Sequence, residues 1–374
     1  MLKIPSIKEL ENELLKDSGL DDMHVFSLSE FDKIWQNNQE LDKILSADEV
    51  KRDVSVFARY LIRVYVGWPV HNDLVKREVL NYLIKVYKSA HDMKAGELFD
   101  ILKKAIEYIP DNHLQICFTK AKSKRNYKDV GNNFAGKQPI KTELRNDGIA
   151  IIGFKSMLKT DEFNDIILDF EENILPKSKA LIVDLRGNSG GNSFYSDRFA
   201  FFLCGKYVDS TKEIYVRTTP EAKKVQQQWN PNASWADKPV SEKLQLLMKG
   251  TDYNINKKHA YMKPIYILTD EHTGSSAEIF LLRMLHHPMV TVIGDNSCGM
   301  AVYGDLAHGL LTNSKIAFSF GMKYWVLEYD NFELNGYKPH IKCDDGVDAM
   351  DVAVAEYNKP NKNNLFHFLF TKSK

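Results

Sequence analysis

Short apolar runs alternate with helical patterns from residue 161 onward, and this alternation constrains the fold more than any other feature of the chain. The apolar runs predict strands, while apolar residues at every third or fourth position predict helices. In chain order we expect helix 162–174, strand 180–184, helix 194–203, strands 213–217 and 264–269, helix 276–285 and strand 290–293. The pattern is typical of an α/β fold with a largely parallel sheet, in which functional groups lie at the carboxyl ends of the strands.

The first 108 residues follow a different pattern. From residue 6 onward, apolar residues recur at spacings of three and four, and Gly and Pro are rare. This spacing predicts an all-helical N-terminal domain over residues 1–108. Short β-rich runs at 115–118 and 148–154 open a second domain, 109–374. Within it, residues 219–262 break the alternation and form either a helical insertion or a lid over the site.

The composition excludes several classes of function. Fifty basic residues balance fifty acidic ones, so no net field draws the chain to nucleic acid or to an anionic membrane. A basic stretch at 120–128 is better explained as a solvated loop or hairpin than as a nucleic-acid arm. No apolar run reaches the roughly 20 residues of a membrane helix. Because the N-terminus lacks the apolar core of a signal peptide, we expect a cytoplasmic protein, although a secreted chain without its signal would look the same.

The strongest chemical signal is the segment Thr273–Glu278, which lies between a predicted strand and a predicted helix. A serine at such a turn is lifted to the edge of the sheet, and the neighbouring amides point toward the helix N-terminus. Ser275 is therefore the candidate nucleophile, with the amide of Ser276 as a candidate donor to an oxyanion. The alternative is that Thr273 or Ser276 only caps the helix.

A glycine-rich loop over residues 184–192, DLRGNSGGN, follows another predicted strand. Glycines allow backbone amides to approach a ligand closely, so Gly190 or Gly191 is a candidate second oxyanion donor. The loop fits neither the P-loop pattern nor the dinucleotide-binding pattern. A tight turn without function is the alternative. The four cysteines form no C-x-x-C pair, which argues against a zinc cage or a redox motif.

Two further candidates are weak when each is taken alone. A serine hydroxyl needs a proton acceptor at neutral pH, and His113, which follows Asp111 and Asn112, is a candidate for that role. Glu333 is a candidate carboxylate to orient the imidazole or to anchor the site. The alternatives are a structural histidine and a surface glutamate.

Taken in order, DLRGNSGG, TGSSAEIF, VIGDNSCG and ELNGYKP make residues 146–345 resemble the tail-specific (C-terminal processing) peptidases and the tricorn core protease. The resemblance implies a crotonase- or Clp-protease-like core of ββα units. It also implies serine peptidase activity on peptide or protein substrates, and no metal or organic cofactor. Only about 30 residues separate 118 from 149, too few for the PDZ module that such proteins commonly insert there.

The resemblance also bears on the general base. The tail-specific branch uses a lysine at the position that Met300 occupies here, and a thioether cannot accept the proton. The tricorn-like branch uses a Ser-His pair in an Asp-Ser-His motif and a later glutamate. Here Asn112 replaces that serine, His113 matches the base and Glu333 matches the glutamate. We therefore expect a serine peptidase of the tricorn-like type.

Two other functions stay open at this point. The fold could serve as a binding module for peptides or apolar ligands, with little turnover. It could also act as an esterase or acyl transferase, because both share an acyl-enzyme with peptidases. The sequence leaves the oligomeric state open, with a homo-oligomer among the alternatives.

Overall fold

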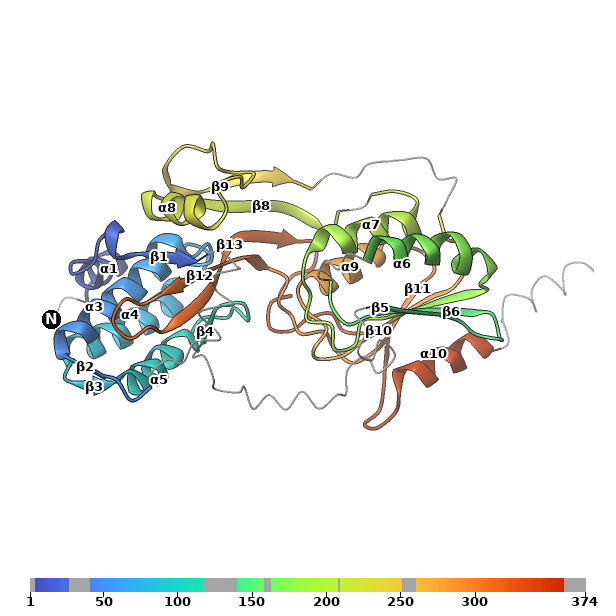
Figure 1. Ribbon diagram of the computed structural model, residues 1–374, viewed down its shortest axis with the longest axis horizontal. Coiled ribbons are helices and arrows are strands. Elements are labelled where there is room, and N and C mark those ends of the chain that lie inside the picture. The colour runs from blue at the N-terminus through green and yellow to red at the C-terminus, as the bar shows by residue number, and fades with distance from the viewer. Residues whose placement is uncertain are drawn as a thin grey trace, which may run out of the picture. The chain divides into compact units, whose positions relative to one another are not determined.

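The chain folds into two compact units, and it passes from one to the other several times. The computed structural model describes residues 4–26, 41–117, 140–157, 163–207, 209–250 and 260–359 (Figure 1). Unit one consists of Met1–Tyr127, Asp209–Thr251 and Gly299–Leu334. Unit two consists of Lys128–Val208, Asp252–Cys298 and Asn335–Lys374. None of the helices in the described ranges has the length and apolar character needed to cross a bilayer.

Unit two is built on a six-stranded sheet. Its order is β14 (Ile341–Lys342), β11 (Val290–Gly294), β10 (Ile265–Thr269), β7 (Ala180–Asp184), β6 (Ile149–Phe154) and β5 (Ile140–Leu144). All neighbours are parallel except β5, which is antiparallel to β6. The predicted α/β fold with a largely parallel sheet is confirmed for this unit.

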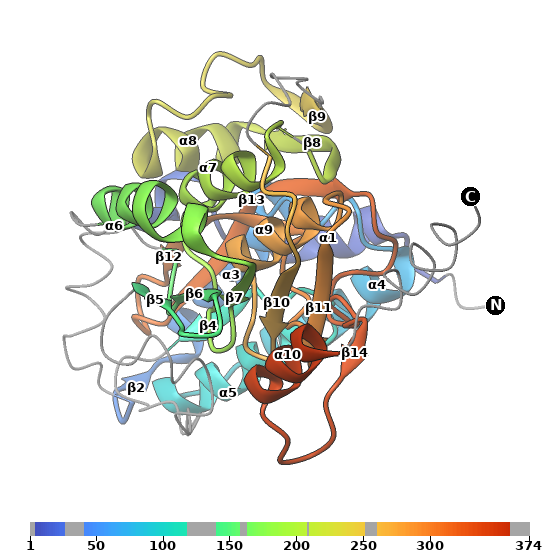
Figure 2. The same cartoon turned by 90° about the vertical axis from the view of Figure 1, so that its right-hand side faces the viewer.

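Helices cover both faces of that sheet (Figure 2). On one face lie α6 (Phe163–Asp169), a π-helical turn at Phe170–Ile174, a 3-10 turn at Leu175–Lys177, α7 (Ser193–Cys204) and α9 (Ser276–Met284). On the other lies α10 (Ala349–Asn358). Strands buried on both faces are apolar along their whole length, and every residue of β7 and β10 is buried. This burial explains the uninterrupted apolar runs in the sequence.

The candidate catalytic turn lies at the carboxyl edge of this parallel sheet. Strands β7, β10 and β11 are adjacent, and the glycine loop, the Ser275 turn and the segment around Ser297 follow them in that order. The Leu185 amide donates to the Leu268 carbonyl at 3.0 Å, which holds the first two of these loops together at their start. Ligand sites of open parallel sheets lie at this edge.

Unit one contains a second, antiparallel sheet. Its order is β1 (His24–Phe26), β12 (Tyr303–Leu310), β13 (Ala317–Leu327), β8 (Thr211–Thr218) and β9 (Ser241–Lys249), and β4 (Gln115–Cys117) also pairs with β13. The prediction that strand 213–217 joins the largely parallel sheet is therefore wrong. An apolar run identifies a strand but not its partner, and β8 pairs antiparallel with both β13 and β9.

The helices that the pattern of the first 108 residues predicts are present, and they pack against this second sheet. They are α1 (Ile7–Leu15), α3 (Ala47–Arg59), α4 (Asp73–Lys88) and α5 (Ala95–Ile106), with a 3-10 turn at Leu20–Asp22 and a π-helical turn at Tyr60–Val64. Phe57 and Tyr60 place their rings 5.2 and 4.9 Å from that of Phe318 on β13. Three short strands in these residues, β1, β2 (Ile44–Leu45) and β3 (Met93–Lys94), are an addition that the all-helical pattern does not predict.

The predicted domain limits stay predictions. Tyr108, where the sequence predicts the end of the helical domain, lies inside the first segment of unit one. The 219–262 segment contains α8 (Pro220–Trp229) and the strand β9, so it adds both a helix and a strand to unit one. The basic stretch 120–128 lies outside the described residues.

Candidate active site

Ser275 occupies an unusual backbone conformation at the start of α9. Its φ is 53° and its ψ is −121°, and α9 begins at the next residue. Positive φ is costly for a residue with a Cβ atom and persists only where the surroundings enforce it. The Ser275 amide donates to Glu278 Oε2 at 3.0 Å, so the side chain of the first helical turn fixes the serine backbone.

A buried polar chain holds Glu278 in turn. Glu278 is fully buried, and its Oε1 accepts a hydrogen bond of 2.6 Å from Ser297 Oγ. The amide of Tyr337 donates to the same Ser297 Oγ at 2.8 Å. Ser297 follows β11, and Tyr337 belongs to the ELNGYKP segment. Two of the motifs behind the family resemblance therefore serve to fix the nucleophile turn.

Acidic side chains shape the beginning of the glycine loop. Asp184, at the end of β7, accepts hydrogen bonds from Nε and Nη2 of Arg186 at 2.9 and 2.8 Å. The Gly187 amide lies 3.0 Å from both carboxylate oxygens of Asp270. Burial raises the pKa of Asp184, and the Arg186 hydrogen bonds oppose this effect.

Gly190 packs directly on the nucleophile. Its φ is 103°, and an added Cβ atom would lie 2.6 Å from the Ser275 Cβ. Its amide donates to Asn188 Oδ1 at 2.9 Å, and the Asn188 carbonyl accepts from the Gly274 amide at 2.9 Å. Asn188 therefore bonds to the loop on one side and to the nucleophile turn on the other.

The amides of Gly191 and Ser276 are the best pair of candidate oxyanion donors. Ser276 Oγ donates to the Gly191 carbonyl at 2.8 Å, which fixes the two residues relative to each other. Among the residues that the structure describes, neither amide has an acceptor. The Gly190 amide is already bonded to Asn188, so Gly191 is the more suitable of the two glycines.

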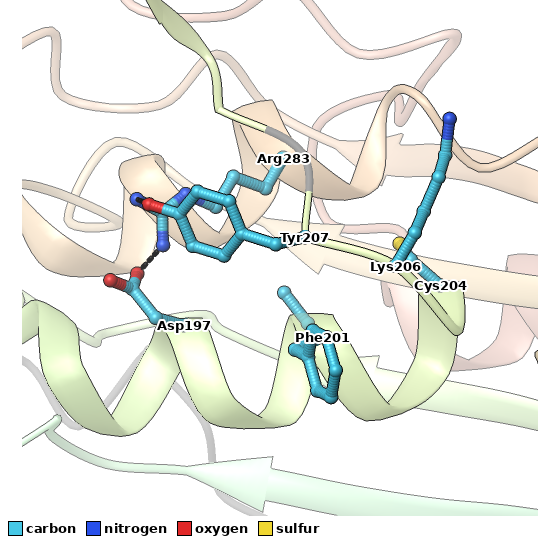
Figure 3. Close-up of a pocket in the computed structure, with 7 residues that line it drawn as sticks. Asp197, Phe201, Cys204, Lys206, Tyr207 and Arg283 are labelled. Carbon is cyan, nitrogen blue, oxygen red and sulfur yellow. Dashed lines mark hydrogen bonds and ion pairs between the residues drawn. The ribbon is translucent and has the colours of Figure 1, made fainter. Parts of the chain in front are cut away.

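The helices that follow these two segments are linked farther along. Phe199 of α7 stacks on Phe280 of α9 with 5.8 Å between ring centroids. Beyond this stack, Arg283 of α9 forms an ion pair with Asp197 of α7 (Figure 3). Arg283 Nη2 also donates to the Tyr207 hydroxyl at 2.9 Å. Burial lowers the pKa of Arg283 to about 10, so the side chain stays cationic at neutral pH.

His113 lies in unit one, in a turn between α5 and β4. The turn is organised by Asp111, whose Oδ1 accepts from the amides of His113 and Leu114 at 2.7 and 3.3 Å. Ser319 Oγ donates to the His113 carbonyl at 2.9 Å. The His113 side chain is buried, and burial lowers its pKa to about 4. At neutral pH the imidazole is therefore uncharged.

Asn112 and Glu333 meet in the same unit. Glu333 accepts from the amide of Asn112 at 3.1 Å through Oε1 and from the amide of Val302 at 3.2 Å through Oε2. Asn112 Nδ2 donates to the Gly299 carbonyl at 3.3 Å. The glutamate sits in a turn in which Asn331 and Leu334 have φ of 55° and 67°. The carboxylate thus anchors the backbone next to His113.

Each unit gathers its own share of the predicted residues. Unit two brings together Ser275, Ser276, Gly190 and Gly191, and unit one brings together His113, Asn112 and Glu333. Sequence reasoning gave no role to the residues that hold them, namely Asn188, Glu278, Ser297 and Asp111. Two of these had a usable signal: Asp111 opens the motif that ends at His113, and a glutamate three residues into a helix, such as Glu278, typically bonds back to the cap residue.

Sequence comparison assigns the chain to a family. The profile of peptidase family S41 matches residues 148–343. The chain therefore belongs to peptidase family S41 and has a mixed α/β fold.

The solved structures that this chain resembles are distant from it in sequence. A candidate peptidase from Parabacteroides merdae is 18% identical, with a TM-score of 0.60 over 85% of this chain and 99% of the other. A lipoprotein from Streptococcus agalactiae is 18% identical, with a TM-score of 0.47 over 83% of this chain and 96% of the other. The photosystem II D1 C-terminal processing protease is 12% identical, with a TM-score of 0.37 over 55% of this chain and 48% of the other.

Proposed function

We propose that this chain is a serine peptidase that cleaves peptide bonds through an acyl-enzyme on Ser275. The observation that carries the proposal is the backbone of Ser275, held at a φ of 53° at the start of α9 with Gly190 packed against its Cβ. Such strain in a residue other than glycine is concentrated at functional sites. A residue that only caps a helix does not need it.

The proposed chemistry is acyl transfer in two steps. Ser275 Oγ attacks the scissile carbonyl carbon, and His113 accepts the hydroxyl proton. As the tetrahedral intermediate collapses, the C–N bond breaks and the proton passes to the leaving amine. Water, deprotonated by the same imidazole, then hydrolyses the ester and returns the proton to Ser275.

The oxyanion of each intermediate would be bound by the amides of Ser276 and Gly191. Loss of one such donor typically costs about 3 kcal/mol of transition-state stabilisation. The first turn of α9 adds a favourable dipole at the same point. Glu333 and Asn112 would act through the backbone, because the Glu333 carboxylate accepts the Asn112 amide directly before His113.

The tricorn-like assignment rests on His113 as base. Its low pKa of about 4, caused by burial, keeps the imidazole neutral at physiological pH. In addition, Met300 offers no amine at the position of the lysine base in the tail-specific branch. We therefore propose the Ser275–His113–Glu333 set, with Asn112 in support, acting on a peptide or protein substrate.

The test is covalent labelling combined with peptide hydrolysis. A fluorophosphonate probe should label the wild-type protein at Ser275, and S275A should abolish the label. Ser189→Ala, in the exposed part of the glycine loop, is the matched control and should label normally. Equal labelling of S275A and wild type would refute the assignment of the nucleophile.

The base is tested by the rate of labelling. His113→Gln should slow labelling by at least about a hundredfold, since general-base catalysis contributes about 10²–10⁴-fold. His272→Gln, three residues before the nucleophile, should have little effect. Comparing the products of peptide and ester substrates by mass spectrometry separates peptidase activity from esterase or acyl-transferase activity. If the peptides are not cleaved and bind equally well to wild type and S275A, the result would favour a binding module instead.

A further inference from the structure

The turn that carries His113 is tied to the N-terminal helices by a buried chain of polar groups. The Tyr65 hydroxyl donates to Asp111 Oδ2 at 2.7 Å, and it lies 3.1 Å from His71 Nε2. The other oxygen of Asp111 accepts the amides of His113 and Leu114. Tyr65, His71 and Asp111 are all buried. The S41 profile begins only at residue 148, so it covers none of these groups.

The local backbone is shaped to bring Tyr65 to this position. The π-helical turn Tyr60–Val64 ends at Tyr65, whose amide donates to the Tyr60 carbonyl at 2.8 Å. π-helical turns are rare and occur frequently at functional sites. The Tyr65 carbonyl accepts from Arg217 Nη1 at 3.2 Å, which ties the same residue to strand β8.

Gly67 leaves the space that the Tyr65 ring needs. A Cβ atom at position 67 would lie 2.2 Å from both Cζ and the hydroxyl oxygen of Tyr65. The ring is therefore folded back over the glycine, with its hydroxyl directed at Asp111. Any side chain at position 67 would push the hydroxyl away from the carboxylate.

We propose that Tyr65 and Asp111 are positioning residues for the general base, and that the N-terminal helices serve to orient His113. Asp111 acts as a template: one oxygen binds the two amides of the turn, and the other binds the Tyr65 hydroxyl. Because a carboxylate held from both sides cannot rotate, the amides it accepts, and the His113 side chain that follows them, are fixed in direction. This inference rests on the proposed function, since it assigns His113 as the base.

The test compares two buried tyrosines at the two ends of one π-helical turn: Tyr60 is its first residue, and Tyr65 directly follows its last. Tyr65→Phe removes the hydroxyl that binds Asp111. The matched control, Tyr60→Phe, removes an equally buried hydroxyl, which donates to the His24 carbonyl at 2.7 Å. We expect Y65F to lower kcat for a peptide or ester substrate about tenfold with KM changed less than twofold. Y60F should leave both within twofold.

Two further variants separate positioning from general destabilisation. Gly67→Ala displaces the ring while keeping every group of the chain, and it should lower kcat to a similar extent as Y65F. Asp111→Asn keeps an oxygen that can accept the two amides, so it should retain more activity than Asp111→Ala. For Asp111→Ala we expect kcat to fall about a hundredfold, because small misplacements of catalytic groups have effects of this size. Equal loss of kcat in Y65F and Y60F would overturn the proposal.

A measurement that does not depend on activity distinguishes the positioning role of Tyr65 and Asp111 from the proposed peptidase function. Hydrogen exchange at the amides of His113 and Leu114 should accelerate at least tenfold in Y65F and not in Y60F. If exchange is unchanged in Y65F, the positioning role is refuted. If exchange accelerates in Y65F but S275A is labelled like wild type, Tyr65 and Asp111 hold the turn as proposed, and the assignment of Ser275 as nucleophile is wrong.

Discussion

The backbone amide of Asn112 donates to Glu333 Oε1 across 221 residues of sequence. The second oxygen of the same carboxylate accepts the Val302 amide at 3.2 Å. Glu333 therefore links the first segment of unit one to its third segment, Gly299–Leu334, and it does so immediately beside His113. Through these two bonds the carboxylate fixes the backbone on the N-terminal side of His113.

Glu333→Gln should weaken this anchor. A glutamine has one acceptor oxygen, so one of the two amides would face an amide NH2 group and lose its partner. We expect a loss of about 1–3 kcal/mol in the free energy of unfolding, and at least a tenfold slower labelling of Ser275. Asp330→Asn, an exposed carboxylate nearby, is the control. Labelling at the wild-type rate in E333Q would exclude Glu333 from the site.

Gly190→Ala should abolish acylation. The added methyl group would lie 2.6 Å from the Ser275 Cβ, in a backbone conformation with φ of 103°. Gly346→Ala is the matched control, because Gly346 has φ of 81° with nothing within 4 Å of the added atom. Both variants should lose stability through backbone strain, of the order of 1 kcal/mol. Only G190A should lose labelling, and comparable labelling in the two would show that Gly190 does not face the nucleophile.

Ser297→Ala should disturb the nucleophile turn from a distance. It removes the donor to Glu278 Oε1 and the acceptor of the Tyr337 amide. Ser178→Ala removes a similarly buried hydroxyl that donates to the Leu175 carbonyl in the same unit. Each should reduce the free energy of unfolding by about 1–3 kcal/mol. Thermal unfolding measures the loss of stability in both variants, and the fluorophosphonate probe measures the labelling rate of Ser275. Only S297A should label more slowly than wild type. Equal labelling rates in S297A and S178A would limit Ser297 to a structural role.

Acidification should destabilise the protein through His113. Burial lowers its pKa from 6.5 to about 4, so between these values the unfolded chain binds a proton that the folded chain does not. Stability must then fall as the pH falls through this window. Asp111, whose burial raises its pKa to about 6, acts in the opposite direction.

A comparison with His113→Gln isolates the histidine, because Asp111 is present in both proteins. We expect the stability of wild type relative to H113Q to drop by on the order of 2 kcal/mol between pH 7 and pH 5. Urea unfolding at several pH values measures the difference. A difference that does not change with pH would mean that the imidazole is solvated.

Arg283 and Asp197 should prove costly to separate. Arg283 is buried and Asp197 is partly exposed, so the full cost of about 3–5 kcal/mol for an uncompensated buried charge applies when Arg283 loses its partner. Arg283→Met and Asp197→Leu should each lower the melting temperature, and the double variant should recover much of the loss. Additive losses in the double variant would argue against coupling of the pair.

The sequence predicts local structure well where one segment is sufficient to determine it. Strand 180–184, the helix that begins at Ser276 and the serine between strand and helix all follow from patterns within a few residues. The sheet to which strand 213–217 belongs does not, because pairing is decided by partners about a hundred residues away.

The same reason limits prediction of the site. Asn188, Ser297 and Tyr65 are ordinary polar residues in the sequence, and their roles arise from hydrogen bonds that only the fold creates. The family resemblance identified Ser275, His113 and Glu333 because the motifs that contain them occur along the chain in the order that is typical of the family. It could not reveal Tyr65, which lies far from the matched region.

The interleaving of the two units has a consequence for synthesis. Strand β13 pairs with β4, β8 and β12, yet it comes from residues 317–327, after most of unit two. The strand is complete only after residue 327 has been synthesised, and the carboxylate that accepts the Asn112 amide is present only after residue 333. Activity through the proposed Ser275–His113–Glu333 set therefore requires synthesis of the chain past residue 333.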